Sequence, residues 1–474
     1  SRAPASRAAL EPPSTTLIRA TRSLATLYPH LSASTGATLK QKISLIMLIG
    51  LIIGGAVIEP EATLDAVLAV LTLPFVFVIG LRTLALAQLL LRPLGRNSKT
   101  ACPRRPAAEL PIYTLIVPLY REAAMIPDLL AALTRLDYPE HKLDILIAIE
   151  AEDRATAAAL ARVALPAAFR IVQVPPGVPR TKPRALAMAL QHARGSIVAV
   201  YDAEDHPDPE QLRRALDVLA RQGETVGCVQ ARLDIDILPL IARLGLPVPL
   251  GGTSNHFPRR LLERIGGWDP YNVTEDADLG VRLARFGWRV AVIESTTWEE
   301  APRRWGAWLR QRTRWLKGWM QTVLVHMREP VDLMRELGEL RFLGFQALMG
   351  GLVLAALVHP WFYLLLAWDI WSGRILELPE SLLGQSFWGL ATINLVAGYL
   401  VSMLLGLVAA LRRGRWALGF AVVLLPLYWL AISYAAHRAL YQLLTDPFRW
   451  EKTPHNPRSN PRARRTRAGA ADRR

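Results

Sequence analysis

The chain has 474 residues, enough for two or three domains, and 51% of them are hydrophobic, with a mean hydropathy of +0.21. The apolar residues are concentrated near both ends, so we expect a soluble block between membrane segments. The net charge of +16 fits cationic loops of a membrane protein better than nucleic-acid binding, and two cysteines exclude a disulfide framework and fit a reducing compartment.

The N-terminal part predicts a loosely ordered segment and then a membrane hairpin. Residues 1–40 are rich in Pro, Ser and Arg, a composition typical of loosely ordered chain. Within 41–92, apolar runs at 43–58 and 64–91 are separated by an acidic turn at 59–61. Lysines and arginines lie outside the hairpin at both ends, so the positive-inside rule predicts that both ends are cytoplasmic.

Between residues 107 and 335, β-rich runs alternate with helical runs, which predicts βαβ units and a mainly parallel sheet. The expected strands are 113–118, 143–149, 169–174, 197–201 and 226–231, and the expected helices between them are 123–136, 155–163, 183–192 and 211–221. Ligands of such sheets bind beyond the carboxyl ends of the strands. Because Glu122, Glu150 and Asp202 each follow a strand end, we expect one pocket to receive all three.

An acidic cluster, Asp202, Glu204 and Asp205, follows the fourth expected strand. Adjacent carboxylates repel one another unless a cation compensates them, and oxygen ligands favour Mg²⁺ or Mn²⁺. A solvated loop is the alternative. Lys182 and Arg184 open the preceding helix, where they form either an anion site or an ordinary exposed basic helix start.

An acid triplet, Thr274-Glu275-Asp276, opens a further helix that ends at Gly287, and a strand-like run, 291–295, follows it. One of the three is expected to cap the helix. Capping by one residue leaves another free to act, and an acid beside a donor pocket is a candidate general base that removes a proton from an acceptor hydroxyl.

A helix expected at about 302–320 is amphipathic and rich in tryptophan, which is typical of a helix at the bilayer surface. Its Gln311, Arg314 and Trp315 also suit a sugar-nucleotide site. A guanidinium matches phosphate oxygens, and an indole stacks on the apolar face of a sugar ring.

Three further apolar runs, 342–368, 387–411 and 416–436, form a C-terminal membrane region, 340–445. Three spans starting from the cytoplasm would place the basic tail, 446–474, outside, against the positive-inside rule. Either one of these segments lies in the interface or the tail breaks the rule, and the sequence leaves both readings open.

The motifs occur in a characteristic order: strand-end acid, Lys/Arg helix start, acid cluster, acid triplet, Gln-x-x-Arg-Trp and membrane spans. Over about 40–455 this series resembles the membrane-embedded, processive-type family-2 glycosyltransferases, which include cellulose, hyaluronan and poly-N-acetylglucosamine synthases. It is most similar to the branch with the phage N4 receptor glycosyltransferase. The resemblance implies a multi-pass protein of the bacterial inner membrane whose cytoplasmic α/β domain is a Rossmann-like GT-A fold flanked by transmembrane helices.

The resemblance also implies ligands and site residues. The ligands are a nucleotide-diphosphate sugar, with a UDP-sugar favoured, and Mg²⁺ or Mn²⁺. The nucleotide-sugar site would be Pro118, Glu122, Glu150, Lys182, Arg184 and Asp202. The metal ligands would be Asp202 and Glu204, with Asp205 as a third acid. Asp276 would be the catalytic base beside Glu275, and Gln230, Gly252, Thr253, Ser254, Gln311, Arg314 and Trp315 would hold the acceptor and the diphosphate.

The expected reaction is inverting transfer of a sugar to a growing glycan. The alternatives are transfer of a single sugar to a lipid-phosphate acceptor, and a catalytically silent receptor or scaffold. Membrane lipids and an envelope export partner are the other expected partners. The chain departs from the family pattern in having Glu204 for the usual Asp, Ala187 for the usual Asn, and a short passage between 231 and 250 where relatives have an amphipathic interface helix.

Overall fold

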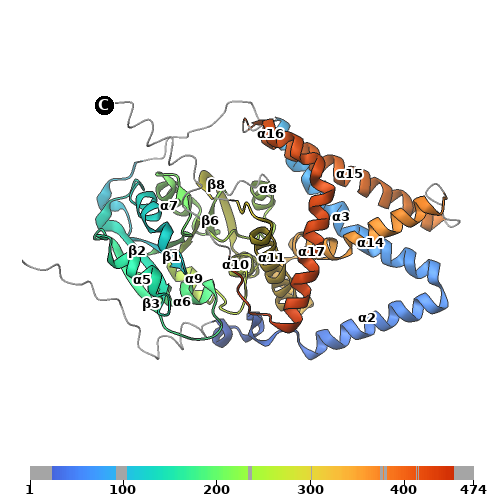
Figure 1. Ribbon diagram of the computed structural model, residues 1–474, viewed down its shortest axis with the longest axis horizontal. Coiled ribbons are helices and arrows are strands. Elements are labelled where there is room, and N and C mark those ends of the chain that lie inside the picture. Colours follow the sequence, from blue (N-terminus) through green and yellow to red (C-terminus); the bar gives the residue numbers. More distant parts are fainter. Residues whose placement is uncertain are drawn as a thin grey trace, which may run out of the picture.

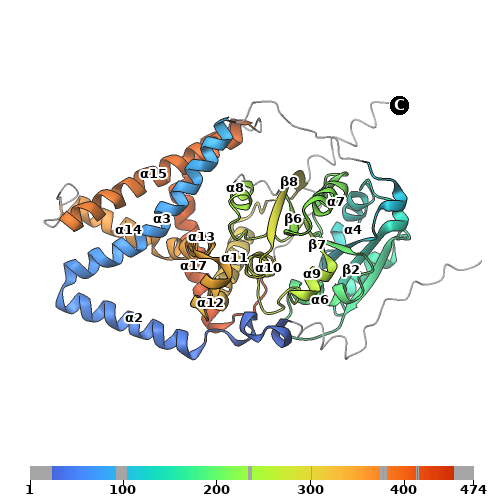
Figure 2. The same cartoon turned by 180° about the vertical axis from the view of Figure 1, so that it is seen from behind.

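The computed structural model describes residues 24–91, 104–232, 237–299, 301–373, 377, 382–412, 414 and 416–452. An α/β domain lies at one end of the molecule, and long helices project from it on one side (Figure 1). The view from behind shows the same division, with α2, α3, α14 and α15 extending away from the sheet (Figure 2).

The α/β domain is built on one eight-stranded sheet with the order β3-β2-β1-β4-β7-β6-β8-β5. The strands are β1 Tyr113–Leu119, β2 Leu143–Glu150, β3 Phe169–Val174, β4 Ile197–Val200, β5 His206–Pro207, β6 Val226–Arg232, β7 Asn255–Pro258 and β8 Arg289–Trp298. Strands β3, β2, β1 and β4 are mutually parallel, as are β6 and β8, whereas β7 runs antiparallel to both of its neighbours. The prediction of a mainly parallel α/β sheet is confirmed, and the short strands β5 and β7 were not predicted.

Alternating side chains of the central strands fill two apolar layers, one on each face of the sheet. Leu115 and Val117 on β1 pack in one layer, whereas Ile116 between them packs in the other. Because successive strand residues point to opposite faces, the continuous apolar run of β1 serves both layers.

Helices lie between the strands along the chain, and several more follow the last strand. They are α4 Ile126–Leu133, α5 Arg154–Ala161, α6 Lys182–Gln191, α7 Gln211–Gln222, α8 Leu238–Arg243, α9 Arg259–Arg264, α10 Glu275–Arg285, α11 Trp305–His326, α12 Pro330–Leu337 and α13 Glu339–Phe345. Helix α8 lies in the passage between 231 and 250, where the described residues contain this one six-residue helix, and residues 233–236 lie outside the described residues.

The projecting helices are α2 Leu39–Ile58, α3 Pro60–Leu91, α14 Leu352–Trp371, α15 Leu382–Arg412, α16 Trp416–Gly419 and α17 Leu425–Thr445. Five helical segments in the described residues are long and apolar enough to cross a membrane: 39–58, 60–91, 339–371, 384–412 and 420–445. Each overlaps one of the five apolar runs seen in the sequence.

The described part of the predicted loose N-terminal segment, 24–38, is packed rather than loose. Leu24 and Ser32 are fully buried, and buried Asp269 accepts hydrogen bonds from the Ser32 hydroxyl and the Ala33 amide. Arg328 donates to the carbonyls of three residues of this segment. A polar composition therefore misled the prediction, because the partners of this segment lie some 240 to 300 residues away. Residues 1–23 of the predicted segment and 453–474 of the predicted tail lie outside the described residues.

Candidate active site

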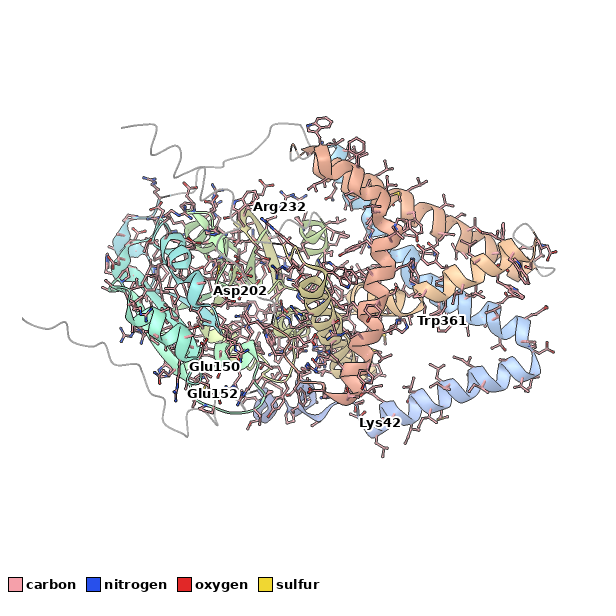
Figure 3. The ribbon with its side chains drawn as sticks, viewed as in Figure 1. Lys42, Glu150, Glu152, Asp202, Arg232 and Trp361 are labelled. Atoms are coloured by element: carbon pink, nitrogen blue, oxygen red, sulfur yellow. The ribbon has the colours of Figure 1, made fainter. Side chains whose placement is uncertain are left out.

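A cavity of about 1400 Å³ opens beyond the carboxyl ends of β1, β2 and β4 and is bounded on the opposite side by α11. In Figure 3 Asp202 is labelled within the α/β domain, and Glu150 and Glu152 are labelled together below it. Predicted site residues that line the cavity are Pro118, Glu122, Glu150, Lys182, Asp202, Glu204, Gly252, Thr253, Glu275, Asp276, Gln311, Arg314 and Trp315. Arg184, Asp205, Gln230 and Ser254 are outside this lining.

The first helical residue of α6, Lys182, brings two predicted motifs together. Its ammonium group lies 2.5 Å from an Asp202 carboxylate oxygen and donates to the Gly252 carbonyl at 2.7 Å. A side chain on Gly252 would begin 3.3 Å from an Asp276 carboxylate oxygen and 3.5 Å from the Lys182 nitrogen. The acid cluster, the basic helix start and the acid triplet therefore converge on one point, which glycine leaves open.

The acid triplet begins α10, with Glu275 as the first helical residue. The Asp276 carboxylate accepts the Ala277 amide at 2.7 Å. Burial raises the carboxyl pKa of both acids, and the neighbouring charge of Asp276 helps to raise that of Glu275 to about 8. Burial alone would lower the pKa of Lys182, but the charges of Asp202, Glu275 and Asp276 raise it above its usual value, so this ammonium group stays charged.

Three predicted residues that do not line the cavity stabilise the loop beside Asp276 through hydrogen bonds. They are Gln230, Ser254 and Asp205. The Gln230 side chain donates to the Thr253 carbonyl and accepts the Gly251 amide, both at 3.0 Å. Ser254 has a positive φ of 57°, an uncommon conformation for a residue other than glycine, and its amide donates to β4 at 2.7 Å. Asp205 is fully buried and accepts hydrogen bonds from the Thr253 hydroxyl and the Asp202 amide.

Arg184 has a different environment from Lys182, although the same motif supplies both. Its side chain is buried, lies 2.6 Å from a Glu150 carboxylate oxygen, and donates to the Pro175 carbonyl. Glu150 lines the cavity at the end of β2. Arg184 therefore orients Glu150 instead of facing the phosphate site that the resemblance assigned to it.

Helix α11 supplies the opposite wall and also holds the acid triplet. Gly318 of α11 faces Thr274 so closely that a side chain there would lie 2.2 Å from the Thr274 hydroxyl oxygen. The Gln321 side chain accepts the Val273 amide at 3.0 Å, and Asn272 donates to the Thr322 hydroxyl at 3.0 Å. The helix with the Gln-x-x-Arg-Trp motif thus fixes the loop that leads to Asp276.

A short segment after α17, residues 446–452, completes the cavity and was missed as a functional element. The Arg314 guanidinium lies 4.3 Å from the centre of the Trp450 ring, and the Lys452 ammonium group lies 2.6 Å from a Glu122 carboxylate oxygen. Lys317 donates to the Arg449 carbonyl at 2.8 Å, which ties this segment to α11. The mixed aromatic and basic sequence FRWEK directly after the last apolar run was the available signal.

The carboxylates that would bind a divalent cation fit that role in part. Asp202 and Glu204 line the cavity and are hard oxygen donors, as Mg²⁺ and Mn²⁺ require. Asp205, predicted as a third ligand, lies outside the lining. Among the described residues no group of three or more His, Cys, Asp or Glu side chains is arranged to hold a metal ion. Two carboxylates suffice for an ion that takes its remaining oxygens from a substrate diphosphate and water.

Comparison with curated proteins identifies related sequences. The chain is 25% identical over 256 residues to the probable glycosyltransferase YdaM of Bacillus subtilis, which covers 49% of this chain and 61% of that protein. It is 26% identical over 308 residues to the beta-monoglucosyldiacylglycerol synthase of Synechocystis, covering 59% and 62%. The chain therefore spans about three fifths of the length of these relatives.

A solved structure has the same fold. The mannosyltransferase PcManGT of Pyrobaculum calidifontis, determined with GDP-Man and Mn²⁺, superposes with a TM-score of 0.50 at 22% identity, covering 80% of this chain and 99% of that one. The α/β domain has the GT-A fold, as expected. A family model described as glycosyltransferase like family 2 matches residues 111–239, and one described as glycosyl transferase family group 2 matches 197–434, half of the chain. The chain belongs to glycosyl transferase family group 2.

Proposed function

We propose that this enzyme transfers a sugar from a nucleotide-diphosphate sugar to an acceptor hydroxyl with inversion at the anomeric carbon. The observation that carries the proposal is the convergence of Lys182, Asp202 and Asp276 on Gly252 at the bottom of one cavity. This arrangement puts a cation and a buried acid at the same reacting centre.

Each charged group has a separate role in this reaction. Asp276 accepts the proton of the acceptor hydroxyl while its oxygen attacks the anomeric carbon. Attack by one nucleophile from the face opposite the leaving group inverts that carbon. Lys182 and Arg314 neutralise the negative charge that develops on the departing nucleoside diphosphate, where stabilisation lowers the barrier. A Mg²⁺ or Mn²⁺ ion held by Asp202 and Glu204 would supply further positive charge to the same leaving group.

The other lining residues bind the two substrates. Pro118, Glu122 and Glu150 surround the nucleoside, with a UDP-sugar as the favoured donor. Gly252, Thr253, Gln311 and Trp315 lie on the acceptor side, and Gln230 and Ser254 support them. The acceptor belongs to a growing glycan, as the resemblance favours, or to a lipid-linked saccharide. Among relatives, the name glucomannan 4-beta-mannosyltransferase indicates a glycan product, and the name beta-monoglucosyldiacylglycerol synthase indicates a glycolipid product.

The enzyme is placed in a bacterial inner membrane with the α/β domain in the cytoplasm. Lys40 lies in the first turn of α2, and Arg104 follows α3 after residues that the structure leaves undescribed, whereas Glu59 lies between the two helices and Glu61 in the first turn of α3. The positive-inside rule assigns the cationic ends to the cytoplasm. Export of a product would require a partner in the envelope.

A donor screen tests the function. Purified chain in lipid nanodiscs is incubated with individual UDP- and GDP-sugars, and release of nucleoside diphosphate and labelled product are followed. We expect turnover of at least one donor, its loss in excess chelator, and its recovery with Mg²⁺ or Mn²⁺. Full activity in chelator would remove the metal from the reaction, and absence of turnover with every donor would favour a silent receptor or scaffold. A product ladder indicates polymer extension, and a single product indicates one transfer.

A further inference from the structure

The catalytic cavity extends past the reacting groups to an apolar annex where α3 and the start of α14 meet the α/β domain. The walls of this annex are Val78, Ile237, Leu238, Ile241, Leu348 and Leu352. These residues line the same cavity as Gly252 and Asp276. Because α3 and α14 belong to segments able to cross a membrane, the annex connects the reacting groups to the level of the lipid.

The chemistry of these walls selects the kind of molecule that fits them. Aliphatic side chains provide no hydrogen bonds, and hydroxyl groups placed against them lose their bonds to water without replacement. A hydrocarbon chain loses nothing there and gains from removal of its surface from water. The annex therefore suits the hydrocarbon part of a lipid better than a hydrated glycan.

One cation faces this apolar region. Arg82 of α3 lines the cavity, and its guanidinium donates to the Ser402 hydroxyl of α15 at 2.8 Å. No carboxylate of the described residues lies within ion-pair distance of it. An arginine in a membrane helix is costly and typically marks a path for a charged ligand. Its planar donors match phosphate oxygens.

The position of Arg82 along α3 agrees with a lipid headgroup. Helix α3 has 32 residues, so it is about 48 Å long against about 30 Å of bilayer hydrocarbon, and its ends extend beyond the hydrocarbon. Arg82 lies roughly 14 Å from the end of α3 that leads to the α/β domain. The guanidinium is thus near the boundary between headgroups and hydrocarbon, where lipid phosphates lie.

We infer that the acceptor is a phosphorylated membrane lipid, bound with its phosphate at Arg82, its hydrocarbon along the annex and its acceptor hydroxyl toward Asp276. This inference rests on the proposed function, because it names the acceptor class for that reaction. A glycerophospholipid and a polyprenyl-diphosphate-linked saccharide share this chemistry.

The test uses the full chain in phosphatidylcholine nanodiscs with whichever nucleotide sugar the wild type turns over. Three acceptors are compared: phosphatidylglycerol, a polyprenyl-diphosphate-linked monosaccharide, and diacylglycerol as the neutral control. We expect transfer to one of the two phosphorylated lipids and little to diacylglycerol. In Arg82→Gln, KM for that lipid should rise about 10- to 100-fold, the loss of a charged hydrogen-bonded pair, with no change in KM for the donor.

Matched variants separate recognition from misfolding. Arg82→Lys keeps the charge without the planar fork and should fall between the wild type and Arg82→Gln. Thr83→Val changes the next residue, an exposed side chain that bonds only within its own helix turn, and should behave as the wild type. Leu352→Trp fills the annex and should also raise KM for the lipid, which keeps the test informative if Arg82→Gln fails to fold.

Three results would overturn the inference. Equal KM values for the lipid in the wild type and a folded Arg82→Gln would show that Arg82 does not bind the lipid phosphate. Preference for diacylglycerol or for a soluble glycan removes the lipid phosphate from recognition while leaving the proposed function intact. Absence of turnover of every nucleotide sugar by the wild type overturns the proposed function and the inference with it.

Discussion

Glu275 and Asp276 are adjacent acids that share the same two cations. Asp276 also lies beside the open space at Gly252, whereas Glu275 is the more deeply buried of the two and starts α10, and the charges of Lys182 and Arg314 act on both. Burial raises the carboxyl pKa of both, and two negative charges so close together are unfavourable. The pair should therefore hold one proton at neutral pH and lose it only in mildly alkaline solution.

This pair predicts a pH dependence of the reaction. Asp276 must be unprotonated to act as a base, and the proton that the pair shares occupies Asp276 part of the time, so kcat/KM should rise with pH until that proton is lost near the Glu275 pKa, about 8. Glu275→Gln removes the neighbouring negative charge and should move this rise to lower pH. The measurement is kcat/KM of the wild type and the variant between about pH 5 and pH 9. Identical profiles would show that the two acids do not influence each other.

Substitutions of Arg184 and Arg180 compare the loss of a buried ion pair with the loss of an exposed one. Arg184→Met leaves the largely buried Glu150 carboxylate without its partner, and breaking a buried ion pair costs about 3 to 5 kcal/mol of the free energy of unfolding. Arg180→Met breaks an exposed pair with Glu152, which is worth about 1 kcal/mol or less. Chemical denaturation in detergent measures both. Similar losses in the two variants would contradict the structural role of Arg184.

At the level of residues, the sequence predicted which motifs meet but not which side chains within a motif face the ligand. Strand ends and helix starts converge in an α/β sheet, so the convergence of Lys182, Asp202 and Asp276 followed from topology and the family resemblance. The inward turn of Arg184 depends on its ion pair with Glu150, and the burial of Asp205 depends on Thr253. These are contacts between distant segments, and no local pattern encodes them.

Among the helices, α11 connects the apolar helices to the loop that leads to Asp276. It contacts the loop before Asp276 through Gly318, Gln321 and Thr322, and it binds the segment after α17 through Lys317. The predicted helix at 302–320 is confirmed in place but extends to His326, and the extension carries the two residues that hold the loop. The sequence showed the amphipathic stretch, whereas the partners of its last turns became visible only in the fold.

The hydrogen bonds between Arg328 and the N-terminal segment lead to a further prediction. Arg328 donates to the carbonyls of His30, Ser32 and Gly36, so Arg328→Met should release residues 24–38 from the α/β domain. Limited proteolysis should then cut within 24–38 much faster than in the wild type. Arg335→Met, which breaks an exposed pair on α12, is the control and should be cut like the wild type. Unchanged protection in Arg328→Met would show that other contacts hold the segment.

The position of α17 resolves the conflict between the basic tail and the positive-inside rule. The end of α15 lies beside the end of α3, where Arg412 donates to the Leu90 carbonyl, and α3 leads into the α/β domain. The C-terminal end of α17 also meets that domain, because Gln321 of α11 donates to the carbonyl of Pro447, which follows α17. Figure 1 shows α17 running alongside α11, across the direction of α2 and α14. We therefore propose that α17 lies on the membrane surface and that four other segments cross it.

Cysteine labelling tests this topology. In a chain carrying Cys102→Ser, Leu427→Cys at the start of α17 and Thr445→Cys at its end should both react with a membrane-impermeant maleimide from the side of the α/β domain. Glu61→Cys, in the first turn of α3, should react only from the opposite side. Labelling of Leu427→Cys and Thr445→Cys from opposite sides would make α17 a span and return the tail to the far side.

At the scale of the whole molecule, a GT-A domain sits against long apolar helices so that one cavity has a charged end and an apolar end. The sequence and the family resemblance predicted the mainly parallel sheet and the apolar runs that form these helices. The short strands β5 and β7, the packing of 24–38 and the return of 446–452 to the cavity were not predicted, since each depends on contacts across the fold. The cavity that joins these groups supports the central claim, which is sugar transfer with Asp276 as the general base.

The rate of sugar transfer by Asp276→Asn tests that claim most directly. The variant keeps the shape of the side chain, so donor binding, measured by calorimetry with the nucleoside diphosphate, should match the wild type. Transfer should fall by about 10² to 10⁴-fold, the usual contribution of a general base. Asp217→Asn, on the outer helix α7, is the control and should transfer normally. Transfer by Asp276→Asn at near wild-type rate, with donor binding intact, would contradict the account.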